Sequence, residues 1–322
     1  MRVDIVRQPL AVAFATLLVF VLVALAHVGG ASAGSIGTPS LLGGFVLHEQ
    51  IAFPLWSRLL SAGLLLGSGL LLGRMSLRYS LYAVHTYLAL PLYGLFACSL
   101  LVSDDYLLSS LISLILVLAI RSYNAAFCNG YGFGSIFRAS LCLGILPLIY
   151  TPLLSLVVLL PMVVILFERS LRETLVAVVG YLLPIFALSY VNWGFGGAFS
   201  TPVVNLCHSF MTHNGFSIAA LTPVLWSTLA LLSLLYLGAV VCYFMGFYTV
   251  SSKSRSILSF QLFLFLIIGA MLFTPCASAA SLPLLAIPAS IFFPLLFIRL
   301  KSTMAMWLYG VVVALCGVAL FF

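Results

Sequence analysis

The chain has 322 residues, of which 64% are hydrophobic and 6% are charged. Soluble domains carry about 25% charged and roughly 45–50% apolar residues, so this composition excludes a soluble globular protein and a disordered chain. The 13 basic and 6 acidic residues give a net charge of +7. They form no block of about five like charges, so we expect no nucleic-acid partner.

Long apolar runs predict a polytopic membrane protein, because about 20 apolar residues cross a hydrocarbon core of about 30 Å. We predict an all-α transmembrane helix bundle that forms a single integral membrane domain over residues 1–322. It has about nine spans plus a hairpin, or about 9–11 helices in all. The predicted spans cover residues 9–28, 57–73, 79–103, 106–120, 174–193, 217–249, 257–276, 282–298 and 303–322.

Two further segments complete the predicted architecture. Residues 43–56 are apolar with one polar pair and end at Trp56, which predicts an interfacial helix on the outer surface. Residues 139–167 contain three prolines and fall short of the about 40 residues that two crossings require. They predict a broken hairpin that enters and leaves on one side. Residues 194–216 are expected to form an outer loop, followed by a C-terminal helix group over 217–322.

The basic residues lie in small clusters between the predicted spans. If the N-terminus is cytoplasmic, every cluster falls on the inner side, and Arg58 is the only basic residue outside. We therefore predict a multi-pass bacterial inner-membrane protein with a cytoplasmic N-terminus and a periplasmic C-terminus. The clusters are Arg2/Arg7, Arg74/Arg78, Arg121/Arg138, Arg169/Arg172, Lys253/Arg255 and Arg299/Lys301.

The predicted outer side holds the candidate catalytic carboxylates. Glu49, beside His48 in the interfacial helix, could act as a general base or help to bind a divalent cation. The alternative is a solvated polar face of an amphipathic helix. Asp104 and Asp105, at the outer end of the third predicted span, are candidates for the same roles, and helix capping is their alternative. A divalent cation is therefore a candidate cofactor.

Candidate substrate-binding residues also fall on the outer side. The guanidinium of Arg58 matches the oxygens of a lipid-linked phosphate, and a headgroup anchor beside Trp56 is the alternative. His48 could contribute from the interfacial helix. His208 and His213 lie in the loop 194–216 without the i, i+4 spacing of a helical metal pair. This loop is either an unspecific metal site or a mobile cover over an active site.

Two other features bear on competing functions. His85 falls inside the third predicted span, where an ionisable side chain indicates either a transport pathway or a histidine hydrogen-bonded to a neighbouring tyrosine. Cys207 and Cys276 both fall on the outer side, where an oxidising compartment would allow them to form a disulfide. The glycine pairs Gly63/Gly67 and Gly69/Gly73 predict close helix packing.

The order of features between His48 and Pro184 resembles the core of the C-type glycosyltransferases (GT-C). The resemblance assigns a GT-C-like part to residues 1–193 and implies a polyprenyl-phosphate sugar donor that is used at the outer membrane face. Two departures stand out: the acidic signature is reduced to Glu49, and Ile149-Tyr150-Thr151 replace a stretch that often holds a lysine. The matching segments are HEQIAFPLWSRLLSAGLLLG, GRMSLR, LVSDDYLLSSLISLILVLAI, SLCLGILPLIYTPLLSLVVLLP and FERSLRE.

The stretch RSYNAAFCNGYGFGSIFRASLCLGILPLIYTP is also similar to a family of polytopic inner-membrane proteins of the Bacteroidota, a match that implies no established activity. Three functions stay open. The chain could transfer a sugar from a polyprenyl-phosphate donor at the periplasmic face. It could instead be a non-catalytic subunit or scaffold of an envelope-assembly or secretion complex, with membrane-protein partners. The third function is that of a transporter or lipid flippase. Membrane lipids are expected partners in all three.

Overall fold

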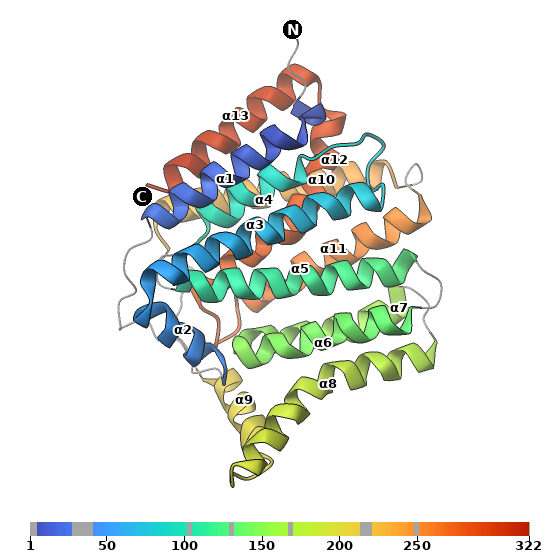
Figure 1. Cartoon of the computed structure of the whole chain (residues 1–322). Helices are drawn as coiled ribbons and strands as arrows, with labels where there is room; N and C mark the ends of the chain where they lie inside the picture. The colour runs from blue at the N-terminus through green and yellow to red at the C-terminus, as the bar shows by residue number, and fades with distance from the viewer. Residues whose placement is uncertain are drawn as a thin grey trace.

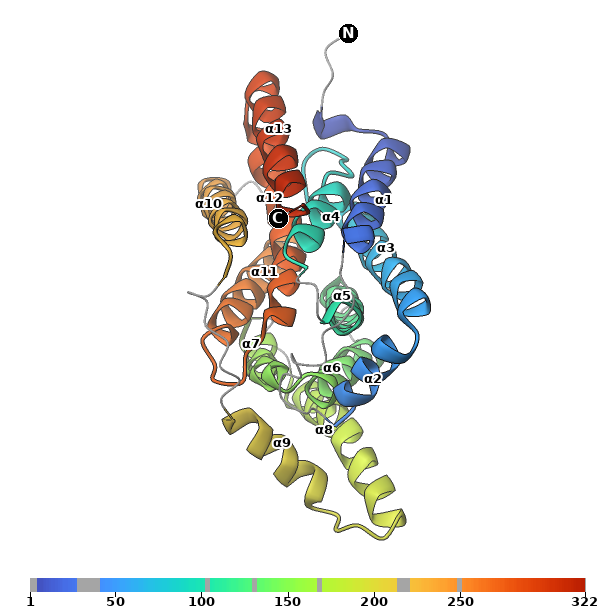
Figure 2. The same cartoon turned by 90° about the vertical axis from the view of Figure 1, so that its left-hand side faces the viewer.

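The structure is a computed structural model that describes residues 5–27, 41–101, 105–128, 132–166, 170–212, 221–247 and 251–321. This part of the chain folds into α-helices and short 3-10 helices joined by turns, and no strand occurs in it. The predicted all-α class is confirmed. Figure 1 shows the long helices lying alongside one another in one bundle, and Figure 2 views several of them nearly end-on.

Eight helical segments of the described residues are long and apolar enough to cross a membrane, which is compatible with the predicted multi-pass protein. Each corresponds to one predicted span, with ends shifted by up to eight residues. They are α1 (Leu10–His27), α3 (Pro54–Arg78), α5 (Tyr106–Cys128), α8 (Leu171–Gly194), α10 (Pro223–Met245), α11 (Ser252–Met271), Ala279–Arg299 (η5, Ala279–Leu285, with α12, Ala286–Arg299) and α13 (Ser302–Ala319).

The third predicted span, 79–103, is wrong as a continuous helix. Only α4 (Ala89–Ser99) forms there, and its 11 residues rise about 17 Å, roughly half of a hydrocarbon core. The preceding residues are irregular because Ser80 adopts a left-handed φ of 46° and the Thr86 hydroxyl accepts a hydrogen bond from the Leu88 amide at 3.1 Å. Every residue of α4 is buried, so surrounding helices cover the broken backbone.

This correction also moves His85. Its side chain is exposed and belongs to the irregular segment before α4, not to the interior of a span. The prediction of an intramembrane histidine, as a transport group or as a partner of a buried tyrosine, is therefore wrong. The transporter alternative loses the support that this residue gave it.

The proline-broken hairpin begins at 133 rather than 139. It consists of α6 (Phe133–Ile149), the 3-10 helix η3 (Thr151–Val158) and α7 (Leu159–Leu166). A 3-10 helix rises about 2.0 Å per residue against 1.5 Å in an α-helix, so η3 and α7 together return about as far as α6 advances. The Leu42 amide, just before α2 (Gly43–Ala52), donates to the Leu148 carbonyl at 2.9 Å. The turn of the hairpin therefore lies level with α2.

Glycines allow the closest helix contacts. A Cβ on Gly144 of α6 would overlap the carbonyl oxygen of Tyr181 in α8, and one on Gly180 would come within 3.0 Å of the Phe137 carbonyl oxygen. The predicted close packing is also found at Gly69, where a Cβ would lie 2.8 Å from a methyl of Leu17, but not at Gly63, which has nothing within 4 Å. Backbones at these crossings approach as small residues permit.

The two ends of the bundle differ in charge. Toward the right of Figure 1, α1, α6, α8 and α13 begin and α3 and α5 end, so the helix termini that carry the basic clusters share this side. The short helices α2 and α9 (Thr201–Met211) lie at the other end. We call these the basic end and the α2 end. Arg2 and Arg169 fall outside the described residues.

Candidate functional site

The predicted interfacial helix forms at the α2 end, but α2 stops at Ala52 rather than continuing to residue 56. Pro54 is the first residue of α3, and a residue before proline avoids helical geometry, so the chain bends at Phe53. Gln50 of α2 is buried, and its Oε1 accepts a hydrogen bond from the Leu107 amide in the first turn of α5 at 3.1 Å. This contact anchors α2 against α5.

An open cavity of about 620 Å³ lies between α2 and the first turns of α3 and α5. Glu49 is half-buried in its wall and is the only carboxylate among the described residues that line it. Ser57 also lines it, and its hydroxyl donates to the Phe53 carbonyl at 2.9 Å and lies 3.3 Å from the Glu49 carbonyl. The remaining lining residues are large and apolar: Phe45, Phe53, Trp56, Leu60 and Leu107. Such a cavity suits an apolar chain that carries one polar group.

Arg58 follows the cavity-lining Ser57 but does not itself line the cavity. Its side chain lies within hydrogen-bonding reach of the hydroxyl of Tyr106, the first residue of α5. Asp105 directly precedes Tyr106, so the α2 end brings Arg58 and Asp105 to neighbouring helix starts. The structure thus gathers Glu49, Arg58 and Asp105 around the first turns of α3 and α5. Asp104 lies outside the described residues.

The histidines do not join this group. His48 is exposed on α2 and does not line the cavity. His208 is exposed on α9, a helix that packs against α8 and η3. His213 lies outside the described residues. Within the described ranges, no three His, Cys, Asp or Glu side chains come together as a group that could hold a metal ion.

Two other predictions for the outer segments need correction. The stretch 194–216 is not a loop throughout, because α9 occupies residues 201–211. Ser200 and Pro202 favour this helix, since proline is well tolerated in a first helical turn. Cys207 is exposed on α9 and Cys276 is buried, and both are free thiols. The disulfide that the sequence left open between them is not formed in the described structure.

Several residues that shape the site were not predicted from the sequence. Gln50 was the available signal, because a glutamine in an apolar stretch must satisfy its amide group when it is buried. The apolar wall could not be predicted, because Phe45, Leu60 and Leu107 do not differ in sequence pattern from residues that face the membrane.

Comparisons with family models, with curated proteins and with solved structures give no match to this chain. The functional interpretation therefore rests on the residues at the α2 end.

Proposed function

We propose that this integral membrane protein transfers a sugar from a polyprenyl-phosphate donor, with Glu49 as general base in the cavity at the α2 end. The observation that supports the proposal is the combination of one half-buried carboxylate with an otherwise apolar wall in an open cavity of about 620 Å³. The resemblance of the segments around Glu49 to the C-type glycosyltransferases points in the same direction.

The chemistry follows from this combination. A polyprenyl chain is apolar and would lie against Phe45, Phe53 and Leu60, while its phosphate would be held by Arg58 at the rim through charge-assisted hydrogen bonds. The Glu49 carboxylate would accept the proton of an acceptor hydroxyl as that oxygen attacks the anomeric carbon. The bond from this carbon to the phosphate oxygen breaks, and polyprenyl phosphate leaves.

The orientation belongs to the same proposal. If the basic end faces the cytoplasm of a bacterial inner membrane, the α2 end opens to the periplasm, where sugars linked to polyprenyl phosphate are used. The positive-inside rule supports this orientation, since the basic clusters share one end of the bundle. A divalent cation, if one takes part, would be bound with help from Asp105 and from oxygens of the donor.

The first test uses binding of the lipid. Undecaprenyl phosphate with a photoreactive diazirine in its chain is added to the purified full-length protein, and cross-linked peptides are identified by mass spectrometry. We expect cross-links in α2 and the first turns of α3 and α5, and their loss in Leu107→Trp, whose indole fills the cavity. Ile51→Ala, an exposed residue of α2 outside the cavity, is the matched control. Cross-links that persist in Leu107→Trp would contradict the proposed donor site.

The second test addresses catalysis. Glu49→Gln keeps the size of the side chain and removes the base, so we expect glycan or glycolipid formation to fall by about 10²–10⁴-fold at unchanged protein abundance. Full activity of Glu49→Gln, together with co-purification of a stoichiometric membrane partner, would instead support the non-catalytic subunit or scaffold.

A further inference from the structure

The basic end of the bundle contains two neighbouring cavities. The first, of about 340 Å³, lies between the end of α3, the end of α5 and the start of α11, and both Arg78 and Lys253 line it. The second, of about 270 Å³, extends toward the end of α12. Ser80 and Ser251 line both cavities and form the wall between them.

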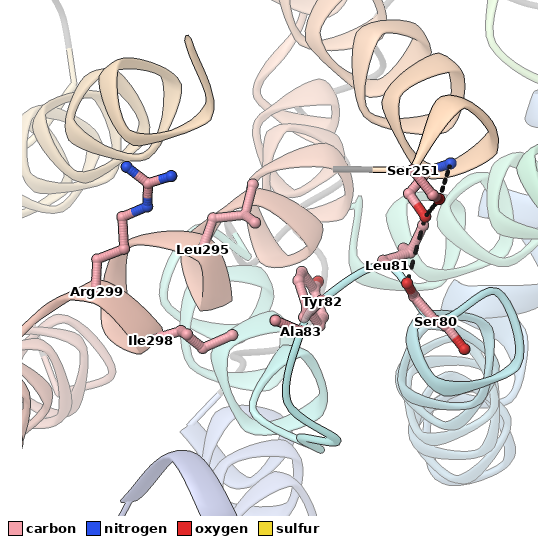
Figure 3. Close-up of a pocket in the computed structure, with 9 residues that line it drawn as sticks. Ser80, Leu81, Tyr82, Ala83, Ser251, Leu295, Ile298 and Arg299 are labelled. Carbon is pink, nitrogen blue, oxygen red and sulfur yellow. Dashed lines mark hydrogen bonds between the residues drawn. The ribbon is translucent and has the colours of Figure 1, made fainter. Parts of the chain in front are cut away.

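Figure 3 shows how the second cavity is arranged. Arg299 lies at one side and Ser80 with Ser251 at the other, and Leu295, Ile298 and Tyr82 lie between them. The dashed hydrogen bonds mark the shared wall: the Ser254 hydroxyl donates to the Ser80 carbonyl at 3.3 Å, and the Ser251 and Ser254 hydroxyls lie 2.8 Å apart.

The charge around the first cavity is one-sided. Arg78 and Lys253 line it, and no carboxylate occurs among its lining residues in the described part of the chain. Burial raises the pKa of the Tyr79 hydroxyl, while the nearby charges of Arg78 and Arg121 lower it by less, so a third cation is close. The segments 129–131 and 248–250, next in sequence to the lining residues, contain no acidic residue. Like charges in one cavity repel each other unless an anion lies between them.

The backbone at this cavity adopts a left-handed conformation. Ser80 is the only non-glycine residue with a positive φ in the described chain, and L-residues other than glycine rarely adopt such a conformation. It is fixed by the hydrogen bond from Ser254 and by a bond from the Leu81 amide to the Ser76 carbonyl at 3.2 Å. Strained residues of this kind cluster at ligand sites.

We propose that the cavity between Arg78 and Lys253 binds a phosphate group, presented either by an anionic phospholipid headgroup or by a soluble phosphate compound. Arg78 provides a planar fork that matches two phosphate oxygens, and Lys253 provides a compact charge. The hydroxyls of Ser80 and Ser251 add hydrogen-bonding groups at the shared wall. Lys253 lies in the first turn of α11, where the helix dipole also favours an anion. Basic pockets between helices on the cytoplasmic side of membrane proteins bind anionic lipid headgroups.

The experiment compares matched pairs of charge removals in the full-length protein. All four side chains compared are exposed. Arg78→Gln/Lys253→Gln removes the two charges that line the first cavity, and Arg138→Gln/Lys301→Gln removes two charges at the same end that line neither cavity. Each protein is purified in detergent with equal amounts of phosphatidylglycerol and phosphatidylcholine, and the retained lipids are counted by native mass spectrometry. A parallel titration with inorganic pyrophosphate follows the displacement of phosphatidylglycerol.

We expect the wild type to retain one phosphatidylglycerol in preference to phosphatidylcholine, and the cavity double variant to lose this preference by about 30-fold. Each basic side chain contributes about 1 kcal/mol toward an anionic lipid, and about 1.4 kcal/mol is a factor of ten. The charge-preserving Arg78→Lys/Lys253→Arg variant keeps most of the preference, which separates lost binding from lost folding.

The titration distinguishes the two sources of the phosphate. If pyrophosphate at millimolar concentration displaces the lipid, the site is one for a soluble phosphate compound, and if it does not, the ligand is the lipid headgroup. If the wild type retains both lipids equally and pyrophosphate does not displace phosphatidylglycerol, the proposal is overturned. It is also overturned if the control double variant loses as much preference as the cavity double variant, since the effect would then come from diffuse surface charge.

Discussion

Gly144→Ala tests the closest helix contact of the bundle. The added Cβ would overlap the Tyr181 carbonyl oxygen and lie 2.9 Å from its carbonyl carbon and 3.1 Å from its Cα. These are backbone atoms in the middle of α8, so no side-chain rotation can make room. The two helices must separate until carbon atoms regain contact distances of about 3.5–4.0 Å.

The magnitude follows from this geometry. A separation of about 0.5–1 Å forfeits a quarter to a half of each dispersion contact along the crossing, and overpacking of a well-packed core costs about 1–3 kcal/mol. The overlap is with rigid backbone, so we expect the upper end of this range, about 3 kcal/mol. At roughly 2 °C for each kcal/mol, the thermal midpoint falls by about 6 °C.

Gly134→Ala is the matched control, because Gly134 lies in the same helix and has nothing within 4 Å of an added Cβ. Alanine is the better helix former, so this variant should be neutral or more stable by up to about 1 kcal/mol. Both variants are heated in detergent, and the folded fraction is followed by size-exclusion chromatography. A Gly144→Ala midpoint within about 1 °C of the Gly134→Ala midpoint would refute the inferred backbone contact.

Three further predictions concern the site, the left-handed turn and the exposed thiol of α9. Gln50→Leu leaves the buried Leu107 amide without its acceptor at 3.1 Å, so we expect the free energy of unfolding to fall by about 1–3 kcal/mol and cross-linking of the lipid probe to weaken. Unchanged stability in thermal unfolding would contradict the hydrogen bond that anchors α2. Ser80→Gly should be more stable than Ser80→Ala by about 1 kcal/mol, because only glycine adopts the φ of 46° without strain. Equal thermal unfolding midpoints of the two variants would contradict that backbone conformation. A membrane-impermeant maleimide applied to intact cells should label the exposed Cys207 and leave the buried Cys276 unlabelled; absence of Cys207 labelling until the cells are opened would reverse the proposed orientation.

The sequence predicted the membrane class and most of the long helices because both depend on local properties. Twenty apolar residues are apolar whatever lies beside them, so the eight long helical segments that could cross a membrane were predicted from composition. The same holds for the basic clusters, whose position between spans is a matter of order along the chain. The end of α2 at Phe53 was misjudged by a few residues, although Pro54 was the signal for it.

The prediction of the third span was wrong because of the tertiary packing around it. Residues 79–103 are apolar enough to cross a membrane as a helix, yet α4 is short and residues 81–88 are irregular. An interrupted helix is tolerated within a membrane bundle here because other helices bury α4. No property of the segment itself reveals that cover. His85 was misplaced for the same reason.

The sequence alone predicted a helical membrane protein whose basic clusters lie between its spans, because hydrophobicity and charge belong to individual residues. Only the tertiary structure decided that Glu49 faces an apolar cavity and that Arg78 and Lys253 share another. Both juxtapositions join helices that are distant along the chain. They depend on which helix faces meet, and that is set by packing at contacts such as the Gly144–Tyr181 crossing.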